Sequence, residues 1–284
     1  MPRTKERYSH EEGLRKDGTK RLPICFCLDT SGSMQTNLSK GSKRTGKSIF
    51  VDGKQYRVVE EGVSAMSELK RGMRIFLNNL EKDKMDAYAA EVSIVTFDDY
   101  ARSILDYSRI ADIPSDIIDD ISTRDNTYMG EGINMALDKL EDCIAEYHRY
   151  NIDYYSPWLV VMSDGKPNGS DYELQAAKMR IQGLQKRENL IVIPVGIGKY
   201  ADKQTLSDLA KGEEVTSIFE IDFEKLFQTM SNTVHNESKL MGGTVVRPNI
   251  NKYMKEDNFE DDNHMSDTKE NLMNGEYFVF DDWE

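Results

Sequence analysis

The feature that most constrains the fold is a series of short apolar runs that alternate with segments of helical periodicity. The apolar runs, which we expect to be strands, are residues 23–28, 92–97, 103–105, 158–162, 190–197 and 217–221. Apolar residues recur at helical spacing in 63–80, 133–147, 172–184, 206–210 and 223–234. Strands that are apolar on both faces and are separated by amphipathic helices are typical of a parallel sheet covered by helices on both sides. We therefore predict a doubly wound, Rossmann-like α/β fold with a mostly parallel, six-stranded sheet.

Charge divides the 284-residue chain into three parts. The net charge is -13, but residues 1–21 carry 7 basic and 4 acidic residues, whereas residues 241–284 carry 4 basic and 11 acidic residues. The last part also has few aliphatic residues. We predict a charged N-terminal arm over 1–21, the folded domain over 22–240, and an acidic C-terminal tail over 241–284 that lies outside the main core.

Composition also excludes several classes of protein. An acidic chain is poorly suited to binding nucleic acid or an anionic membrane surface. No apolar run reaches the roughly 20 residues that a membrane span needs, and residues 1–21 lack the apolar core of a signal peptide. The cysteine count is odd, and Cys25 and Cys27 share one face of an apolar strand. We interpret them as small hydrophobic residues of a reduced, cytoplasmic protein.

Oxygen-bearing side chains follow the predicted strands where ligands bind in such folds. Asp29, Ser31 and Ser33 come directly after the first strand, and Asp164 follows the strand at 158–162. Thr127 precedes the helix at 133–147. Two carboxylates and three hydroxyls form an all-oxygen set that suits a hard cation, most simply Mg²⁺, with Mn²⁺ and Ca²⁺ as alternatives.

These motifs resemble the metal-ion-dependent adhesion site, or MIDAS, of von Willebrand factor A (vWA) domains, over about residues 22–240. The resemblance implies direct ligation by Ser31, Ser33 and Thr127. It also implies that Asp29 and Asp164 bind directly or through water, and that a carboxylate of a partner fills the sixth position.

Further motifs are similar to the TerY-like branch of the vWA family, named from tellurite-resistance operons. They are Arg21-Leu22-Pro23-Ile24, Val95-Thr96-Phe97-Asp98, Met129-Gly130-Glu131-Gly132 and Asp164-Gly165-Lys166-Pro167. The similarity implies a bacterial or phage-encoded stress-response or defence system, in which protein kinases and phosphatases are candidate partners. We therefore expect a non-enzymatic, metal-dependent protein–protein interaction module.

Two features depart from the family's pattern. Arg124-Asp125-Asn126 stands where the family has a glycine-rich run, and the Asp125 charge could repel an acidic ligand or add a ligand to the metal. An insert at about 35–62 separates the first motif from the first helix, and Asp52-Gly53 within it predicts a β-hairpin. Its six basic residues are Lys40, Lys43, Arg44, Lys47, Lys54 and Arg57. The hairpin is either a solvated surface element or a partner-binding lid beside the metal site.

An alternative hypothesis is that the protein is an enzyme, because part of the insert matches a nucleotide-binding motif. Gly41-Ser42-Lys43-Arg44-Thr45-Gly46-Lys47-Ser48 matches the P-loop pattern of nucleotide-binding proteins. A P-loop needs a helix after it, and 49–59 is hairpin-like instead. The alternative function is thus a P-loop NTPase, or a metal-dependent phosphohydrolase that uses Asp29 and Asp164.

The last nine residues, 276–284, combine aromatic and acidic side chains. They could form a linear docking element for a partner or a strand on the domain's own surface. A third hypothesis is self-binding, in which a tail carboxylate takes the open position of the metal.

Overall fold

A computed structural model describes residues 20–35, 44–51, 54–59, 64–124, 126–198, 201–210, 216–218, 222–239, 271–273 and 276–279. For 44–51, 54–59, 216–218, 271–273 and 276–279 the description covers the backbone alone. The described residues form a large α/β unit and a small antiparallel sheet.

The large sheet has six strands in the order β5-β4-β1-β6-β7-β8. They are β1 (Leu22–Asp29), β4 (Ala90–Phe97), β5 (Ala101–Arg109), β6 (Trp158–Ser163), β7 (Ile191–Ile197) and β8 (Thr216–Ile218). Every neighbouring pair is parallel except β4 and β5. The predicted mostly parallel, six-stranded sheet is confirmed. The chain starts in the centre at β1, moves to one edge and then returns to the other, so the order reverses beside β1.

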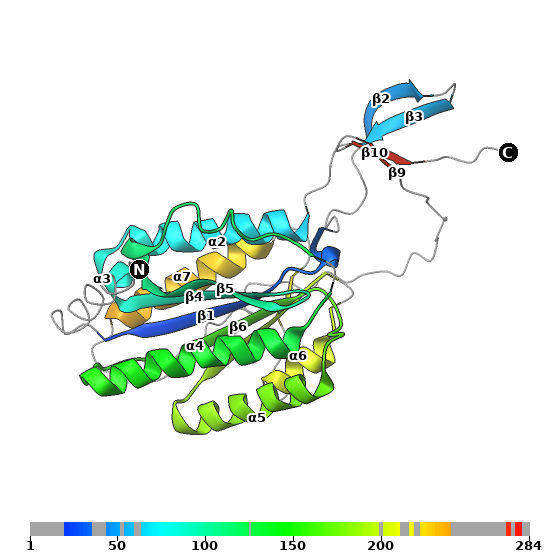
Figure 1. Ribbon diagram of the computed structural model, residues 1–284. Helices are drawn as coiled ribbons and strands as arrows, with labels where there is room; N and C mark the ends of the chain where they lie inside the picture. The colour runs from blue at the N-terminus through cyan, green and yellow to red at the C-terminus, as the bar shows by residue number, and fades with distance from the viewer. Residues whose placement is uncertain are drawn as a thin grey trace, which may run out of the picture.

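Helices cover both faces of this sheet (Figure 1). The first layer holds α2 (Ala65–Glu81), α3 (Lys84–Ala89) and α7 (Asp222–Lys239), and the second holds α4 (Met129–Tyr150), α5 (Asp171–Arg187) and α6 (Lys203–Leu209). Two short 3₁₀ helices, η1 (Gly32–Gln35) and η2 (Ile110–Asp112), lie in loops. Sequence periodicity did not predict α3, because a six-residue helix is less than two turns and shows no repeat.

The central strand β1 explains why its run of residues is apolar throughout. Phe26 packs against Phe76 of α2 and Phe227 of α7, with ring centroids 5.3 and 5.9 Å away. Cys25 and Cys27 point to the other face and join the core under α4. Burial raises the pKa of the Cys25 thiol to about 12, so this cysteine stays protonated at neutral pH. The described cysteines are free thiols, buried as small hydrophobic residues.

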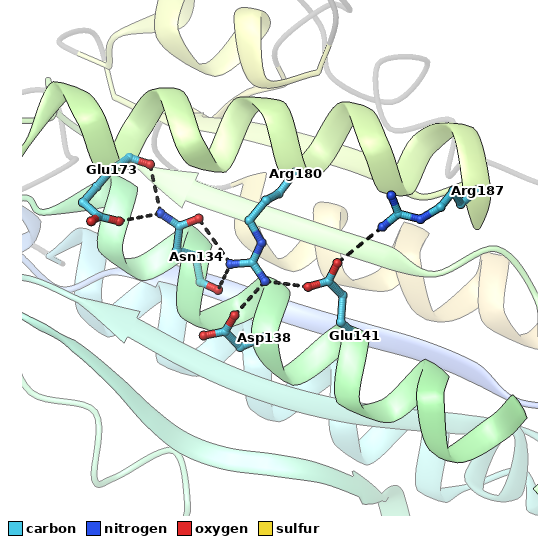
Figure 2. Close-up of polar contacts among 6 residues, drawn as sticks. All are labelled: Asn134, Asp138, Glu141, Glu173, Arg180 and Arg187. Carbon is cyan, nitrogen blue, oxygen red and sulfur yellow. Dashed lines mark hydrogen bonds and ion pairs between the residues drawn. The ribbon is translucent and has the colours of Figure 1, made fainter. Parts of the chain in front are cut away.

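The second helical layer is held by both packing and charge. Gly132 of α4 lies so close to β4 that an added Cβ would come within 2.6 Å of the Phe97 side chain. Figure 2 shows Arg180 of α5 reaching across to Asp138 and Glu141 of α4, each at 2.6 Å. Helix α4, which follows Thr127, is therefore held firmly between the sheet and α5.

The small sheet has the order β2-β3-β10-β9. Its strands are β2 (Arg44–Val51), β3 (Lys54–Val59), β9 (Asn271–Met273) and β10 (Glu276–Val279). The antiparallel pairing of β2 with β3 is the hairpin that the sequence predicts within the insert. The tail adds to it, because Phe278 and Val279 of β10 pair with Val58 and Arg57 of β3. Apart from Lys20 and Arg21 of the arm and strands β9 and β10 of the tail, the predicted arm and tail lie outside the described residues.

In the part of the chain that the structure describes, no helix combines the length and the hydropathy that a membrane span requires.

Candidate metal centre

The loop after β1 places three oxygen-bearing side chains within one turn. Asp29 ends β1, and the chain then turns into η1, which starts at Gly32. The Ser31 N–H donates to Asp29 Oδ1 at 2.8 Å, a short-range bond that closes the turn. Ser31 and Ser33 are thereby folded back over the end of the strand, and their hydroxyl oxygens lie 3.0 Å apart.

Asp29 is a buried carboxylate with an unfavourable environment for its charge. Its second oxygen, Oδ2, accepts a 2.5 Å hydrogen bond from the Ser163 hydroxyl at the end of β6. Burial nevertheless raises the pKa of Asp29 to about 6, and the nearby Asp164 carboxylate contributes to the increase. No described Lys or Arg side chain forms an ion pair with either carboxylate. A buried negative charge of this kind is stabilised by a cation.

Asp164 completes a chain of close oxygens that begins at Ser31. The Ser33 hydroxyl donates to Asp164 Oδ1 at 2.8 Å. Burial raises the pKa of Asp164 above its usual value as well. The oxygen–oxygen distances of 3.0 and 2.8 Å match the edge of an octahedron of Mg²⁺ ligands, about 3.0 Å for bonds of about 2.1 Å. The donor set and its spacing therefore fit a small, hard divalent cation.

Thr127 lies in the loop before α4 and is buried. Its N–H donates to the Asn168 side chain at 2.8 Å, and its carbonyl accepts from the Asn168 N–H at 3.2 Å. Asn168 belongs to the loop that carries Asp164. Among the hydrogen bonds of the described residues, none joins Thr127 directly to the other four predicted ligands. The structure thus connects Asp29, Ser31, Ser33 and Asp164 in one network, and connects Thr127 to it through the Asn168 loop.

Asp98 has a positioning role that the sequence did not reveal. It follows β4 and is fully buried, and its carboxylate accepts from the Thr30 hydroxyl at 2.8 Å and pairs with Arg102. Its carbonyl accepts from the Tyr128 N–H at 3.0 Å. Asp98 thus ties the loop of Ser31 to the loop of Thr127. Its position at a strand end, as for Asp29, was the available signal. Ser163 and Asn168 were also missed, because each acts through a partner far away along the chain.

The rim of this site carries positive charge. Arg124 is exposed, and its backbone forms a β-bridge with Ser31. The guanidinium groups of Arg124 and Arg102 lie 5.5 and 4.4 Å from the ring centroid of the exposed Tyr100. Arg102 is paired with Asp98, so Arg124, whose backbone adjoins Ser31, is the side chain of this positive rim that an acidic group would meet. The predicted effect of Asp125 concerns a residue outside the described part.

The alternative enzyme readings gain no support from the geometry. Residues 44–48 of the P-loop pattern lie in strand β2, which continues into β3, so no helix follows to supply aligned N–H groups. Of the four histidines, the described ones are His148 and His235. His148 contacts Tyr154, and His235 contacts Asp86 of α3 at the far side of the domain.

Comparison with known proteins agrees with the fold. The von Willebrand factor domain of the type V pili tip protein Mfa5 from Porphyromonas gingivalis aligns with a TM-score of 0.55 and 10% identity, over 80% of this chain and 99% of that one. A von Willebrand factor type A protein from Catenulispora acidiphila aligns with a TM-score of 0.52 and 16% identity, over 76% of this chain and 43% of that one. Proximal thread matrix protein 1 from the mussel byssus aligns with a TM-score of 0.50 and 18% identity, over 77% of this chain and 47% of that one.

The chain thus spans about half the length of the last two proteins. No curated protein sequence matches it significantly. The sequence model of the von Willebrand factor type A domain matches residues 24–233, which is most of the chain and contains the whole six-stranded sheet except its first two residues. The chain therefore belongs to the von Willebrand factor type A domain family.

Proposed function

We propose that this vWA domain binds a partner protein through a divalent cation, with Mg²⁺ as the physiological ion. In this proposal Ser31, Ser33 and Thr127 ligate the ion directly, and Asp29 and Asp164 ligate it directly or through water. The bound ion would supply a Lewis-acidic position for one oxygen of a partner's carboxylate. The observation that carries the proposal is the convergence of the Ser31, Ser33 and Asp164 oxygens, 3.0 and 2.8 Å apart in turn, beside the buried Asp29 carboxylate.

The positive rim supports an acidic ligand over a basic one. Three uncharged hydroxyls and two carboxylates leave no excess negative charge once a dication is bound. Arg124, which adjoins Ser31, then adds positive charge beside this loop, whereas the charge of Arg102 is compensated by Asp98. Because like charges repel, a basic ligand would be disfavoured at the same place.

The proposed role is binding without catalysis. It requires a rigid loop cluster, and the hydrogen bonds of Asp98 and Asn168 to neighbouring loops provide one. We further propose a cytoplasmic setting in a bacterial or phage stress-response or defence system of the TerY-like type. A protein kinase or phosphatase is the proposed class of partner. The similarity of the motifs at 95–98, 129–132 and 164–167 to that branch supports this context.

Affinity capture with the immobilised full-length chain tests the proposal. Proteins from the source cells are captured in buffer with Mg²⁺, in buffer with EDTA, and on the variant Asp29→Ala. We expect a partner that is retained with Mg²⁺ and lost under both other conditions, because each removes the ion. A partner that binds equally in EDTA would contradict the proposal. Addition of ATP to the same protein should give no phosphate release, with Lys47→Ala as the control for a P-loop.

A further inference from the structure

A second cluster of metal-ligating side chains lies at the other end of the strands, away from the site after β1. Its members are Asp83, which precedes α3, Asp86 in α3, and His235 in α7. One ligand atom of each lies within 4.8 Å of those of the other two. The cluster is next to the amino end of β4, whereas the adhesion-type site is at the carboxyl ends of β1 and β6. The two ends of an eight-residue strand such as β4 are about 25 Å apart, so the two clusters are well separated.

The distances within the cluster suit a single ion. The His235 Nδ1 atom lies 2.7 Å from Asp86 Oδ2 and 3.6 Å from Asp83 Oδ2. Ligands in a tetrahedral site with bonds of about 2.0–2.1 Å are about 3.3–3.4 Å apart. The observed distances lie on either side of this value: the distance from His235 to Asp83 is close to it, and the hydrogen-bond distance from His235 to Asp86 would lengthen by about 0.6 Å when an ion binds between them.

The local structure also orients the three ligands in advance. Asp83 is the N-cap of α3, and its Oδ1 accepts from the Met85 N–H at 2.8 Å, which turns Oδ2 toward His235. The Asp86 side chain is only 3% exposed, so its carboxylate has little freedom to rotate away. His235 is 37% exposed, which leaves a path from solvent. Two carboxylates facing one imidazole form a donor set that a dication can bind.

We propose that Asp83, Asp86 and His235 form a second metal site, which takes a borderline dication, Zn²⁺ first. The imidazole ligand distinguishes it from the all-oxygen site, because nitrogen ligands favour Zn²⁺ over Mg²⁺. On binding, the lone pair of His235 Nδ1 becomes the ligand, and the neutral ring keeps its one proton on Nε2. A bound ion would connect α3 to the C-terminal half of α7. The inference is independent of the proposed partner-binding function.

Zn²⁺ titration of the full-length chain by calorimetry tests this site. The titration uses the Asp29→Ala variant, so that the site after β1 cannot contribute. We expect one equivalent of Zn²⁺ to bind. Adding His235→Gln should weaken binding by about 100-fold or more, since it removes the nitrogen ligand. The matched control His148→Gln, an exposed histidine elsewhere, should leave the affinity unchanged.

A second variant distinguishes loss of a metal ligand from loss of folding. Asp83→Asn keeps a side chain that caps helices well but removes one anionic ligand, and we expect it to weaken Zn²⁺ at least about 10-fold. Circular dichroism verifies that each variant is folded. The proposal is overturned if the parent binds no Zn²⁺, or if folded His235→Gln or Asp83→Asn binds it as tightly as the parent. Either result would mean that the cluster is only an imidazole–carboxylate contact between α3 and α7.

Discussion

Replacing Asp29 with Asn should raise the stability of the metal-free protein and at the same time remove its stabilisation by Mg²⁺. Burial raises the folded-state pKa of Asp29 from 3.8 to about 6, so the ionised carboxylate is destabilising at pH 8. A shift of about 2.2 pKa units at 1.36 kcal/mol per unit corresponds to about 3 kcal/mol. Without metal at pH 8, we therefore expect Asp29→Asn to be more stable than the wild type by up to about 3 kcal/mol.

The surroundings of Asp29 can accept an amide. The Asn oxygen can still accept from the Ser31 N–H, which now donates at 2.8 Å. The amide nitrogen can donate to Ser163, whose hydroxyl has the Gly165 carbonyl as another acceptor at 3.4 Å. The amide oxygen and one amide N–H then have partners, and we expect removal of the buried charge to dominate the change in stability.

The pH dependence has a defined sign. Because the folded pKa exceeds the unfolded one, the contribution of Asp29 to stability is present at low pH and is lost as the pH rises through 6. The advantage of Asp29→Asn should therefore fall to about half its value at pH 5. Other titrating groups cancel, since both proteins contain them. Mg²⁺ at 100 times its dissociation constant should stabilise only the wild type, by about 2.7 kcal/mol.

Urea unfolding in EDTA, monitored by tryptophan fluorescence, measures these differences. Trp158 in β6 is buried and should report unfolding. At pH 8 the midpoint of Asp29→Asn should lie about 1 M above that of the wild type. The control Asp116→Asn, which changes an exposed carboxylate, should shift stability by less than about 0.5 kcal/mol. If Asp29→Asn is less stable than the wild type at pH 8 without metal, the reasoning about a destabilising buried charge is wrong.

Three further substitutions test the site and the scaffold. Ser33→Ala should weaken Mn²⁺ binding by about 10-fold or more in calorimetry while leaving metal-free stability nearly unchanged, because the side chain is exposed; equal affinity would exclude it as a ligand. Gly132→Ala should cost about 1–3 kcal/mol in urea unfolding, because the new Cβ would overlap the buried Phe97 ring; an unchanged midpoint would contradict that packing. Arg180→Ala should cost only about 1 kcal/mol, because its ion pairs are partly exposed and screened; salt should reduce the difference, and a larger, salt-independent loss would indicate a packing role instead.

The sequence predicted the fold well because periodicity is a local signal. The apolar runs and helical repeats correspond to the six strands of the large sheet and to most helices, and the hairpin signal at Asp52-Gly53 corresponds to β2 and β3. The strand boundaries were predicted less closely. The strand expected at 103–105 extends over Ala101–Arg109, because most residues of this edge strand are only partly buried and many are polar.

The candidate site was only partly predictable. Residues that directly follow strands, such as Asp29 and Asp164, could be placed together because parallel strands end at one edge. The roles of Ser163 and Asn168 could not, since each depends on a partner more than 40 positions away along the chain. The cluster of Asp86 with His235, 149 residues apart, had no sequence signal for the same reason.

A crystal of the full-length chain grown with Mn²⁺, and measured at the manganese absorption edge, tests the central claim most directly. Mn²⁺ is a close substitute for Mg²⁺ at oxygen ligands and gives an anomalous signal. The account predicts an anomalous peak within bonding distance of the Ser31 and Ser33 hydroxyls, with Thr127 and the carboxylates around it. Absence of a peak there, or a Lys or Arg side chain filling that position, would contradict the account.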